Sequence, residues 1–403
     1  MKALKKVVIA PDSFKESLSA LGVADAIERG FRQIYPQAHY VKLPMADGGE
    51  GTVESMVAAT GGEIVQVTVT GPLGEPVQGF YGLLGDGETA VIEMAAASGL
   101  HLAPPNRRDP RITTSYGTGE LMLAALERGV KAIILGIGGS ATNDGGAGMM
   151  QALGVKLLDK DGRPLPVGGA ALAQLAQLDL AGLDARWQRV SVTAACDVDN
   201  PLCGEKGASA VFGPQKGATP EMVAQLDAAL HHYGELLERE TGRAVLAQPG
   251  AGAAGGMGAA LLGMLDARLR PGIEIVTETL RLDEVVRDAD LVITGEGRLD
   301  SQSIHGKTPI GVARVAKRYG VPVIAIAGSL TPDYSVVHQH GIDAAFFGAR
   351  SYCDAGRSAG GRRSQSAGDG AQRGGGMAAG ARKKPTGIAC CCYRFRCRTF
   401  PLQ

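Results

Sequence analysis

The sequence predicts an α/β fold in which a Rossmann-like parallel-sheet domain is interrupted by an inserted second α/β domain with a mixed sheet. Apolar runs typical of strands alternate with amphipathic stretches typical of helices along most of the 403 residues. Residues 1–75 and 285–347 share a compact strand–helix–strand rhythm, whereas 76–284 carries long glycine-rich loops. With 45% hydrophobic and 20% charged residues, the chain can bury a sizeable core.

The N-terminal elements begin with a short buried strand at 7–10, the sequence VVIA. Apolar residues at the 3.6-residue period predict a helix over 20–31. Residues 63–70 and 77–84 predict strands around the turn GPLGEP, and 89–94 predicts a third strand. This part of the sheet is expected to be more antiparallel than the rest.

The remaining elements follow the same alternation. The predicted helices cover 118–128, 221–240, 259–266, 279–288, 309–319 and 332–340. The predicted strands cover 131–135, 190–195, 290–294, 321–326 and 342–346.

Composition excludes several classes of protein. No apolar run reaches the roughly 18 residues of a membrane span. The apolar run after MKALKK is too short for a signal peptide, so a cytoplasmic protein is expected. Aromatic residues make up 4% and glycines number 59, which suits an enzyme with glycine-rich loops better than a protein that stacks on nucleic-acid bases. We expect neither nucleic-acid nor membrane binding, and a homodimer is left open.

The segment 348–403 departs from this pattern. It holds eleven of the 41 Lys and Arg residues but two of the 41 Asp and Glu residues, and five of the seven cysteines. It lacks hydrophobic periodicity, so we predict an atypical, disordered basic tail. The abrupt change after a good strand favours a reading-frame shift over a tail that binds nucleic acid or a membrane.

Carboxylates follow the predicted strands at several points. These are Asp12, Asp47, Asp197, Glu296 and Asp300. Open α/β sheets bind ligands at the carboxyl ends of their strands, where such groups can bind Mg²⁺, orient a hydroxyl or act as a general base. Any one alone could be a turn or N-cap residue, but several together at strand ends beside glycines favour a functional site.

Three glycine-rich loops could bind anions through backbone N–H groups: GIGGSATNDGG, PGAGAAGGMG and TGEGRLD. The first contains Gly136, Gly138 and Ala141 in the spacing G-x-G-x-x-A, with Asp159 further on, which resembles a dinucleotide fingerprint. An NAD(P)-dependent hydroxy-acid oxidoreductase therefore stays an alternative. Ser115 in TTSYGTGEL fits an N-cap and an anion contact equally well.

Basic residues stand beside hydroxyl groups in two places, Lys15 beside Ser13 and Lys307 beside Thr308. Such pairs suit a carboxylate or a phosphate. The motif around Lys307 is not a Walker A loop, because Ser301 stands where that motif needs glycine. No paired histidine spacing for zinc and no G-x-S-x-G elbow occurs.

Eight motifs in order resemble the bacterial glycerate kinase family of the two-domain type 1 (glycerate 2-kinase). They are IAPDSFKESLSA, LPMADGGEGT, TSYGTGEL, GIGGSATNDGGAGM, CDVDNPLCGEKGA, FGPQKGA, PGAGAAGGMG and TGEGRLDSQSIHGKTPIGVA. The resemblance covers residues 1–346. It implies ATP-dependent phosphorylation of D-glycerate, typically to 2-phosphoglycerate, in a cleft between a Rossmann-like domain and an inserted domain. Family members continue with a docked helix where this chain has its odd tail, so a destabilised or inactive homologue is a further alternative.

The resemblance and the residues together give a set of expected roles, with ATP and Mg²⁺ as cofactors. The expected catalytic residues are Asp197, Asp47, Asp300 and Lys307, with Asp197 the first choice for the base and Asp197 and Glu296 as metal ligands. The expected substrate contacts are Asp12, Ser13, Lys15, Arg298 and Ser115. The expected ATP and phosphate contacts are Gly138, Gly139, Ser140, Asn143, Asp144, Gly255, Gly256, Gly295, Glu296 and Gly306.

Overall fold

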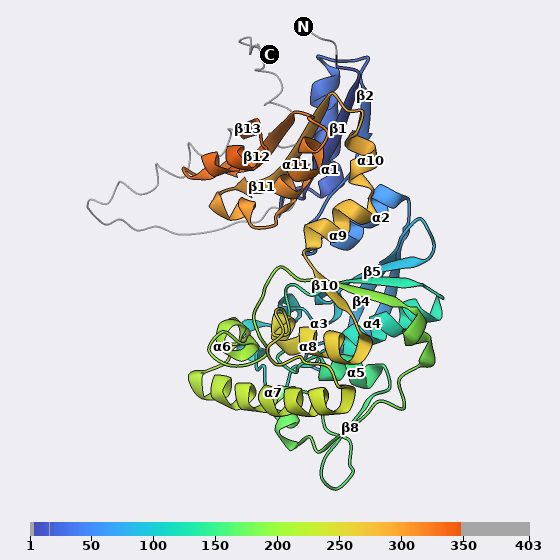
Figure 1. Cartoon of the computed structure of the whole chain (residues 1–403), viewed down its shortest axis with the longest axis vertical. Coiled ribbons are helices and arrows are strands. Elements are labelled where there is room, and N and C mark those ends of the chain that lie inside the picture. The colour runs from blue at the N-terminus through green and yellow to red at the C-terminus, as the bar shows by residue number, and fades with distance from the viewer. Residues whose placement is uncertain (1–3, 16, 348–403) are drawn as a thin grey trace, which may run out of the picture.

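The computed structural model describes residues 4–15 and 17–347, and the expectations for 348–403 lie outside these residues. Two sheets dominate it, one above the other in Figure 1. Strand β1 pairs in parallel with β11, which lies nearly 300 residues later in the chain. The second sheet is therefore inserted into the first, which confirms the predicted fold class.

The first sheet has five strands in the order β13-β12-β11-β1-β2, and every pair is parallel. Both faces are covered: Val7 and Ile9 of β1 pack with α1, whereas Val8 and Ala10 belong to the cluster that includes α11. This burial explains the continuous apolar run VVIA. The elements are β1 (Lys6–Pro11), α1 (Ala20–Arg32), β2 (His39–Lys42), α10 (Leu282–Val286), β11 (Leu291–Leu299), α11 (Thr308–Lys317), β12 (Val323–Leu330) and β13 (Ala344–Phe347).

The second sheet has six strands in the order β10-β9-β6-β5-β4-β3. The pairs β3–β4 and β4–β5 are antiparallel and the others parallel, which confirms the mixed sheet. Because β3 precedes residue 75 and pairs with β4, we propose that the inserted domain starts before β3. The strands are β3 (Glu63–Thr70), β4 (Pro76–Leu83), β5 (Thr89–Glu93), β6 (Ala132–Gly136), β9 (Ser191–Ala195) and β10 (Arg268–Arg270).

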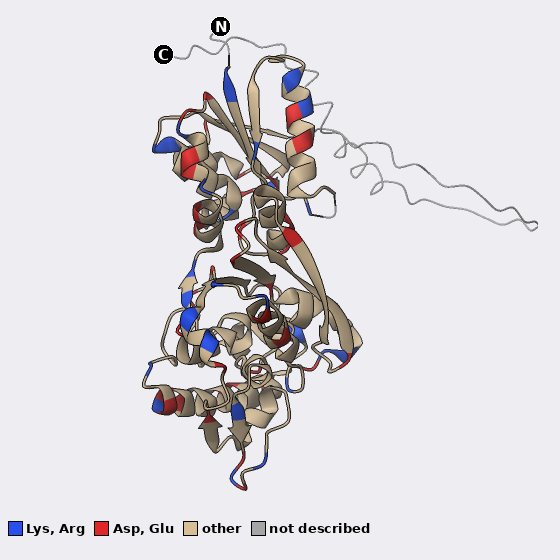
Figure 2. Cartoon of the chain, turned by 90° about the vertical axis from the view of Figure 1, so that its right-hand side faces the viewer, with Lys and Arg blue, Asp and Glu red and all other residues tan. Residues whose placement is uncertain are grey.

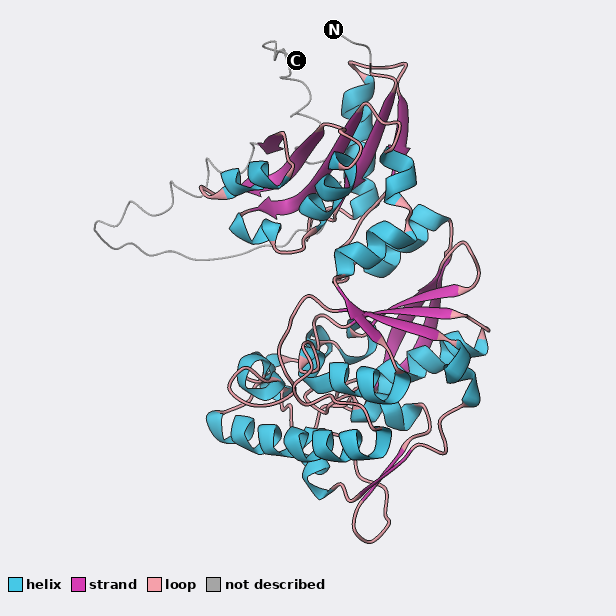
Figure 3. Cartoon of the chain, in the orientation of Figure 1, coloured by secondary structure: helices cyan, strands magenta, loops and turns pink. Residues whose placement is uncertain are grey.

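Helices surround the second sheet, as Figure 3 shows. The long α7 begins at a Thr219 cap, whose hydroxyl accepts from the Met222 N–H, and ends at Gly242 with φ of 70°. The helices are α3 (Ala95–Ser98), α4 (Tyr116–Glu127), α5 (Ala147–Ala152), α6 (Ala208–Phe212), α7 (Pro220–Thr241) and α8 (Ala253–Leu265). A small antiparallel pair is formed by β7 (Lys156–Leu158) and β8 (Gln177–Asp179). Short 3₁₀ turns cover Leu100–Leu102, Pro105–Arg107, Gly169–Gln174, Ala185–Arg189, Pro214–Lys216, Ser301–Ile304 and Tyr334–His340. Among the described residues no helix is long and apolar enough to cross a membrane.

Two helices, α2 (Thr52–Thr60) and α9 (Gly272–Thr279), lie between the two sheets (Figure 1). Their apolar residues share one buried cluster with residues of both sheets: Met56 of α2 and Ile273 of α9, together with Ile134 of β6 and Val292 of β11. This shared core fixes how the carboxyl ends of the two sheets face each other.

Glu93, the last residue of β5, ties α2 to the second sheet. Its side chain accepts a hydrogen bond from the Val53 N–H at 2.9 Å, and the residue is 7% exposed. Burial raises the pKa of Glu93 to about 7, with a smaller contribution from the charge of Glu54. Glu93 therefore caps α2 directly after the loop that carries Asp47.

We expect Glu93→Gln to flatten the pH dependence of stability. The folded pKa of Glu93, about 7, lies above its ordinary value of 4.5. The stabilising contribution of this group is therefore complete below pH 4.5 and is lost as pH rises through about 7. The loss is at most about 3 kcal/mol, and the Gln amide keeps the acceptor without titrating. Urea unfolding at pH 5 and pH 8 measures the difference.

The matched control is Glu54→Gln, an exposed position on the same helix. It should keep nearly the wild-type pH dependence. The raised pKa of Glu93 would be contradicted if wild type and Glu93→Gln lost the same free energy of unfolding between pH 5 and pH 8.

Candidate active site

The candidate carboxylates gather where the carboxyl ends of the two sheets face each other. Asp12 follows β1 and Asp197 lies two residues beyond β9. Strand β11 was predicted to end at residue 294 but continues to Leu299, because it pairs with β12 as far as Leu330. Glu296 therefore lies within a strand. Figure 2 shows acidic positions on the segments between the two sheets.

Asp12 is held at the start of α11. Its Oδ1 accepts from the Ser13 N–H at 2.6 Å, and its Oδ2 accepts from the Thr308 hydroxyl at 2.8 Å. Burial raises the pKa of Asp12 to about 7, and the negative charges of Asp47 and Glu296 raise it further, against those two hydrogen bonds. An acid of this pKa is partly protonated at neutral pH.

Lys307, which precedes α11, neutralises the acids of the neighbouring loop. Its Nζ lies 3.4 Å from Glu296 Oε2 and 3.8 Å from Asp300 Oδ1. Glu296 is 8% exposed and also accepts from the Ser303 hydroxyl. Burial raises the pKa of Glu296, while Ser303 and Lys307 oppose the shift. Asp300 accepts from the Gln302 N–H and caps the 3₁₀ turn, and the exposed Arg298 pairs with it at 3.3 Å.

Asp197 comes from the second sheet and approaches this loop. Its Oδ1 accepts from the Gly272 N–H, at the start of α9, at 3.1 Å. Gly306 has φ of 80°, and a Cβ built on it would lie 3.8 Å from Asp197 Oδ1. Asp197 is exposed at the edge of the cavity, and partial loss of hydration there raises its pKa; the charges of Asp47 and Glu274 raise it further. The Lys307 loop and the end of β9 therefore face each other directly.

A cavity of about 390 Å³ opens beside Asp197. It is lined by Asp47 and Asp197, by the backbone of Gly138–Ser140, by Lys216 and by the start of α8. The structure thus brings together the expected residues Asp47, Gly138, Gly139, Ser140 and Asp197 from segments that are far apart in the sequence. Two carboxylates, a glycine-rich segment and a lysine thus line one cavity. These residue types are the ones that a phosphate site uses.

Other expected residues lie in the interior. Ser115 and Asp144 are both 0% exposed and bind each other: Asp144 Oδ2 accepts from the Ser115 N–H and hydroxyl, each at 2.8 Å. Burial raises the pKa of Asp144. Asn143 is also 0% exposed and donates to the Ser209 hydroxyl.

Several expected glycines allow segments to approach closely. Gly255 and Gly256 have φ of 69° and 91°, and a Cβ on Gly255 would lie 2.0 Å from the Thr142 carbonyl oxygen. A Cβ on Gly295 would lie 2.0 Å from the Ile326 carbonyl oxygen. These positions shape the loops at the site by packing. Lys15 is exposed at the end of β1, beside Ser13.

Sequence reasoning missed two residues, Glu93 and Lys216. Lys216 is 1% exposed, and its Nζ donates to Ser140 Oγ at 2.7 Å and to the Thr142 carbonyl at 2.6 Å. Its position within the quoted motif FGPQKGA was an available signal, but a lysine between glycines gives no sign of burial.

The dinucleotide interpretation finds no structural support around β6. Helix α5 begins at Ala147, well after the fingerprint residues Gly136–Ala141, so no helix N-terminus follows the glycines directly. Asp159 lies in the turn after β7, where it pairs with Arg163 at 3.0 Å. The oxidoreductase alternative is not carried further.

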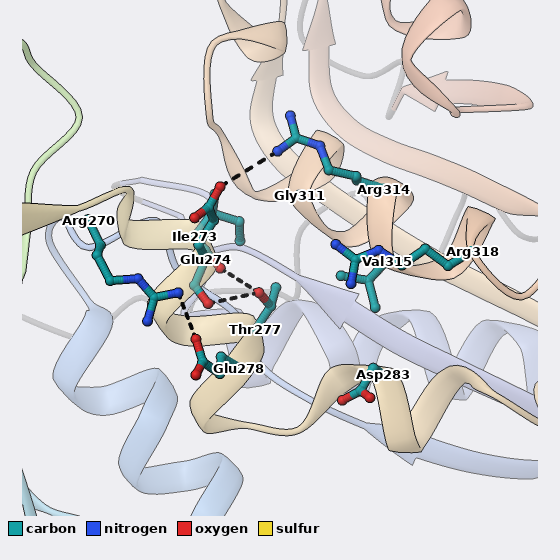
Figure 4. A pocket seen from close by; sticks show the side chains of 10 residues that line it. All are labelled: Arg270, Ile273, Glu274, Thr277, Glu278, Asp283, Gly311, Arg314, Val315 and Arg318. Carbon is teal, nitrogen blue, oxygen red and sulfur yellow. Dashed lines mark hydrogen bonds and ion pairs between the residues drawn. The ribbon is translucent and has the colours of Figure 1, made fainter.

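A second cavity of about 440 Å³ lies between α9, α10 and α11 (Figure 4). Ion pairs cross its mouth: Arg270 lies 2.7 Å from Glu278, and Arg314 lies 3.9 Å from Glu274. It is lined by residues of these helices, by Arg318 directly after α11 and by Arg270 at the end of β10, and it contains none of the glycine-rich loop residues that line the first cavity. The first cavity is therefore the candidate active site.

Comparison with known proteins identifies one family. The model of the glycerate kinase family matches residues 7–371. The chain is 64% identical over 341 residues to a glycerate kinase of Haemophilus influenzae, covering 85% of this chain and 90% of that protein. It is 62% identical to a glycerate 2-kinase of Escherichia coli, with the same coverage.

A solved structure agrees with these relatives. The crystal structure of a candidate glycerate kinase 2 from Salmonella typhimurium LT2 superposes with a TM-score of 0.80 at 61% identity, covering 85% of this chain and 90% of that one. The chain belongs to the glycerate kinase family.

Proposed function

We propose that this protein transfers the γ-phosphoryl group of ATP to D-glycerate and forms 2-phospho-D-glycerate. The observation that carries the proposal is the approach of the Lys307 loop to Asp197 beside the cavity, at Gly306. Phosphoryl transfer needs positioned reactants and neutralised charge more than covalent chemistry from the protein. A cation-bearing loop that faces a carboxylate across a cleft meets that need.

The nucleotide phosphates are proposed to lie along Gly138, Gly139 and Ser140, with Lys307 and the backbone at Gly306 on the other side. Gly138 has open space where a Cβ would point, with no atom nearer than 4.0 Å outside its chain neighbours. Asn143, Asp144, Gly255, Gly256 and Gly295 are proposed to support this site from the interior by holding its loops in shape. Ser115 is proposed to act in the same way, through its hydrogen bonds to Asp144.

D-Glycerate is proposed to bind at the ends of β1 and β11. Ser13, Lys15 and Arg298 are the candidates for its carboxylate. Asp12 is the candidate for orienting a hydroxyl, because it is anchored through both of its oxygens. Burial of Asp12 keeps its pKa near 7, so it can accept or donate a hydrogen bond there.

Asp197 is proposed as the base that accepts the proton of the attacking hydroxyl. Its Oδ1 has one backbone donor, the residue lines the cavity, and partial loss of hydration raises its pKa, which makes it a stronger base. Asp300 suits this role less, because its carboxylate is engaged by Gln302, Lys307 and Arg298. Asp300 is proposed instead to hold Lys307 in place.

Mg²⁺ is proposed to accompany ATP. Among the described residues no three His, Cys, Asp or Glu side chains converge as a metal cage. This fits Mg²⁺, which usually takes one or two carboxylates and completes its shell with phosphate and water oxygens. Asp47 is our candidate ligand, since it lines the cavity and its charge already raises the pKa of Asp12 and Asp197.

This assignment differs from the expected pair of Asp197 and Glu296. Both oxygens of Glu296 have partners, Ser303 and Lys307, so we propose that Glu296 positions the lysine. Asp197 then stays available as base. A bound Mg²⁺ would neutralise charge on the phosphates during transfer.

The activity is tested with the purified full-length chain, ATP, Mg²⁺ and D-glycerate. Enolase added without phosphoglycerate mutase should yield phosphoenolpyruvate, because enolase accepts the 2-phosphate directly. Omission of D-glycerate is the blank. Product that appears only after mutase is added would mean the 3-phosphate, and no product in either mixture would contradict the proposal.

Asp197→Asn should lower kcat by about 10²–10⁴-fold with little change in the KM for ATP, because it removes a base and keeps the side-chain shape. The control is Asp199→Asn, an exposed neighbour that does not line the cavity. It should keep wild-type turnover. Near-normal kcat in Asp197→Asn would remove this residue as the base.

A further inference from the structure

Lys216 is a buried cation with no anionic partner at contact distance. It is 1% exposed, and its ammonium donates to one hydroxyl and one carbonyl, those of Ser140 and Thr142. Across the described residues, no carboxylate forms an ion pair with it. Asp144 acts on it only at longer range, since the Asp144 oxygens accept from Ser115, Gly146 and Gly148.

Such burial is costly. An ammonium removed from water without a paired charge is strongly destabilised, and its side chain tends to lose the proton instead. Burial accordingly lowers the pKa of Lys216 to about 7, with a weak opposing effect from Asp144. Packing alone would be served better by an apolar side chain of the same length. The position therefore calls for a ligand that supplies the missing negative charge.

The surroundings of Lys216 favour a phosphate group as that ligand. Lys216 lines the 390 Å³ cavity together with Gly138, Gly139 and Ser140. An ammonium has three N–H donors, of which two are engaged by Ser140 and Thr142. Both partners belong to the glycine-rich segment that follows β6. Two hydrogen bonds therefore hold the Lys216 ammonium against this loop. A fixed cation behind backbone N–H groups is a common arrangement for phosphate oxygens.

We propose that Lys216 is a phosphate-binding residue of the nucleotide site, placed on the opposite side of the cleft from Lys307. This inference rests on the proposed function, because it assigns the anion to ATP. It places one lysine in each domain against the phosphate chain, so that phosphate binding draws on both sides of the cleft. Lys216 is thereby assigned to binding, and Asp197 keeps the role of base.

The assignment predicts a particular pH dependence of binding. The ammonium of Lys216 is charged below its pKa of about 7 and loses its proton above it. A bound phosphate favours the charged form, so the affinity of the wild-type protein should fall as pH rises above 7. Lys216→Met keeps the length of the side chain without a charge. The phosphate affinity of Lys216→Met should therefore not fall in this way as the pH rises above 7.

The experiment is titration calorimetry of the full-length chain with inorganic tripolyphosphate, and separately with ATP, from pH 6.5 to 9. Lys216→Met should bind tripolyphosphate at least 10-fold more weakly than wild type at pH 6.5, and the two should converge by pH 9. The difference between the two proteins cancels the titration of the ligand itself. Lys206→Met, an exposed lysine ten residues earlier, is the matched control and should behave as wild type.

Each other outcome decides against the proposal. Equal tripolyphosphate affinity in wild type and Lys216→Met at every pH would overturn it. Loss of D-glycerate affinity with phosphate affinity intact would overturn it in favour of a carboxylate site. If Lys216→Met does not fold, Lys216→Arg is used instead, because an arginine keeps its charge over the whole pH range. Its tripolyphosphate affinity should not fall as the wild-type affinity does. A fall equal to that of wild type would overturn the proposal.

Binding separates this inference from the proposed function. Tripolyphosphate binding that depends on Lys216, in a wild-type protein that does not phosphorylate D-glycerate, would contradict the proposed function and leave the phosphate site standing. Turnover of D-glycerate with no effect of Lys216→Met on nucleotide affinity would contradict the phosphate site and leave the proposed function standing.

Discussion

The apolar packing of α2 and α9 between the two sheets holds both halves of the site together. Met56 and Ile273 share a core with Ile134 of the second sheet and Val292 of the first. The same two helices serve the site at their N-termini: Gly272 donates to Asp197, and Val53 donates to Glu93 directly after the Asp47 loop. A shift of either helix would therefore move a functional carboxylate relative to the Lys307 loop.

Several ionisable groups near the cleft are buried, although charged groups are more stable in water. Asp12, Glu93 and Lys216 are buried enough that burial moves the pKa of each to about 7. Such burial is costly to the fold. Glu93 is partly compensated by the Val53 N–H at the start of α2, whereas Asp12 and Lys216 lie in the candidate site, where a bound ligand would offset the cost. Acids and lysines come from both sheets: Asp12 and Lys307 belong to the first, and Asp197 and Lys216 to the second. A nucleotide and its metal ion would complete this charge balance.

Glycines in the glycine-rich loops serve two purposes: some leave room beside the cavity, and others let two backbone segments approach closely. The sequence does not show which glycine serves which purpose. Gly138 borders the cavity with open space around it, as a phosphate contact requires. Gly255 is needed because the Thr142 carbonyl lies where its Cβ would be. Both look alike in a sequence, because the reason for glycine is a neighbour that is distant along the chain.

The sequence by itself determined the α/β class, the interrupted parallel sheet, most of the elements and the family, because strand and helix periodicities are local and eight motifs stand in order. It also named Asp12, Asp47, Asp197 and Lys307, which follow strands or precede a helix. Only the tertiary structure decided that β3 pairs in the second sheet, that Ser115 and Asp144 bind each other in the interior, and that Lys216 is buried behind Ser140. Burial and partner choice depend on contacts between segments far apart in the chain, and no local pattern records them.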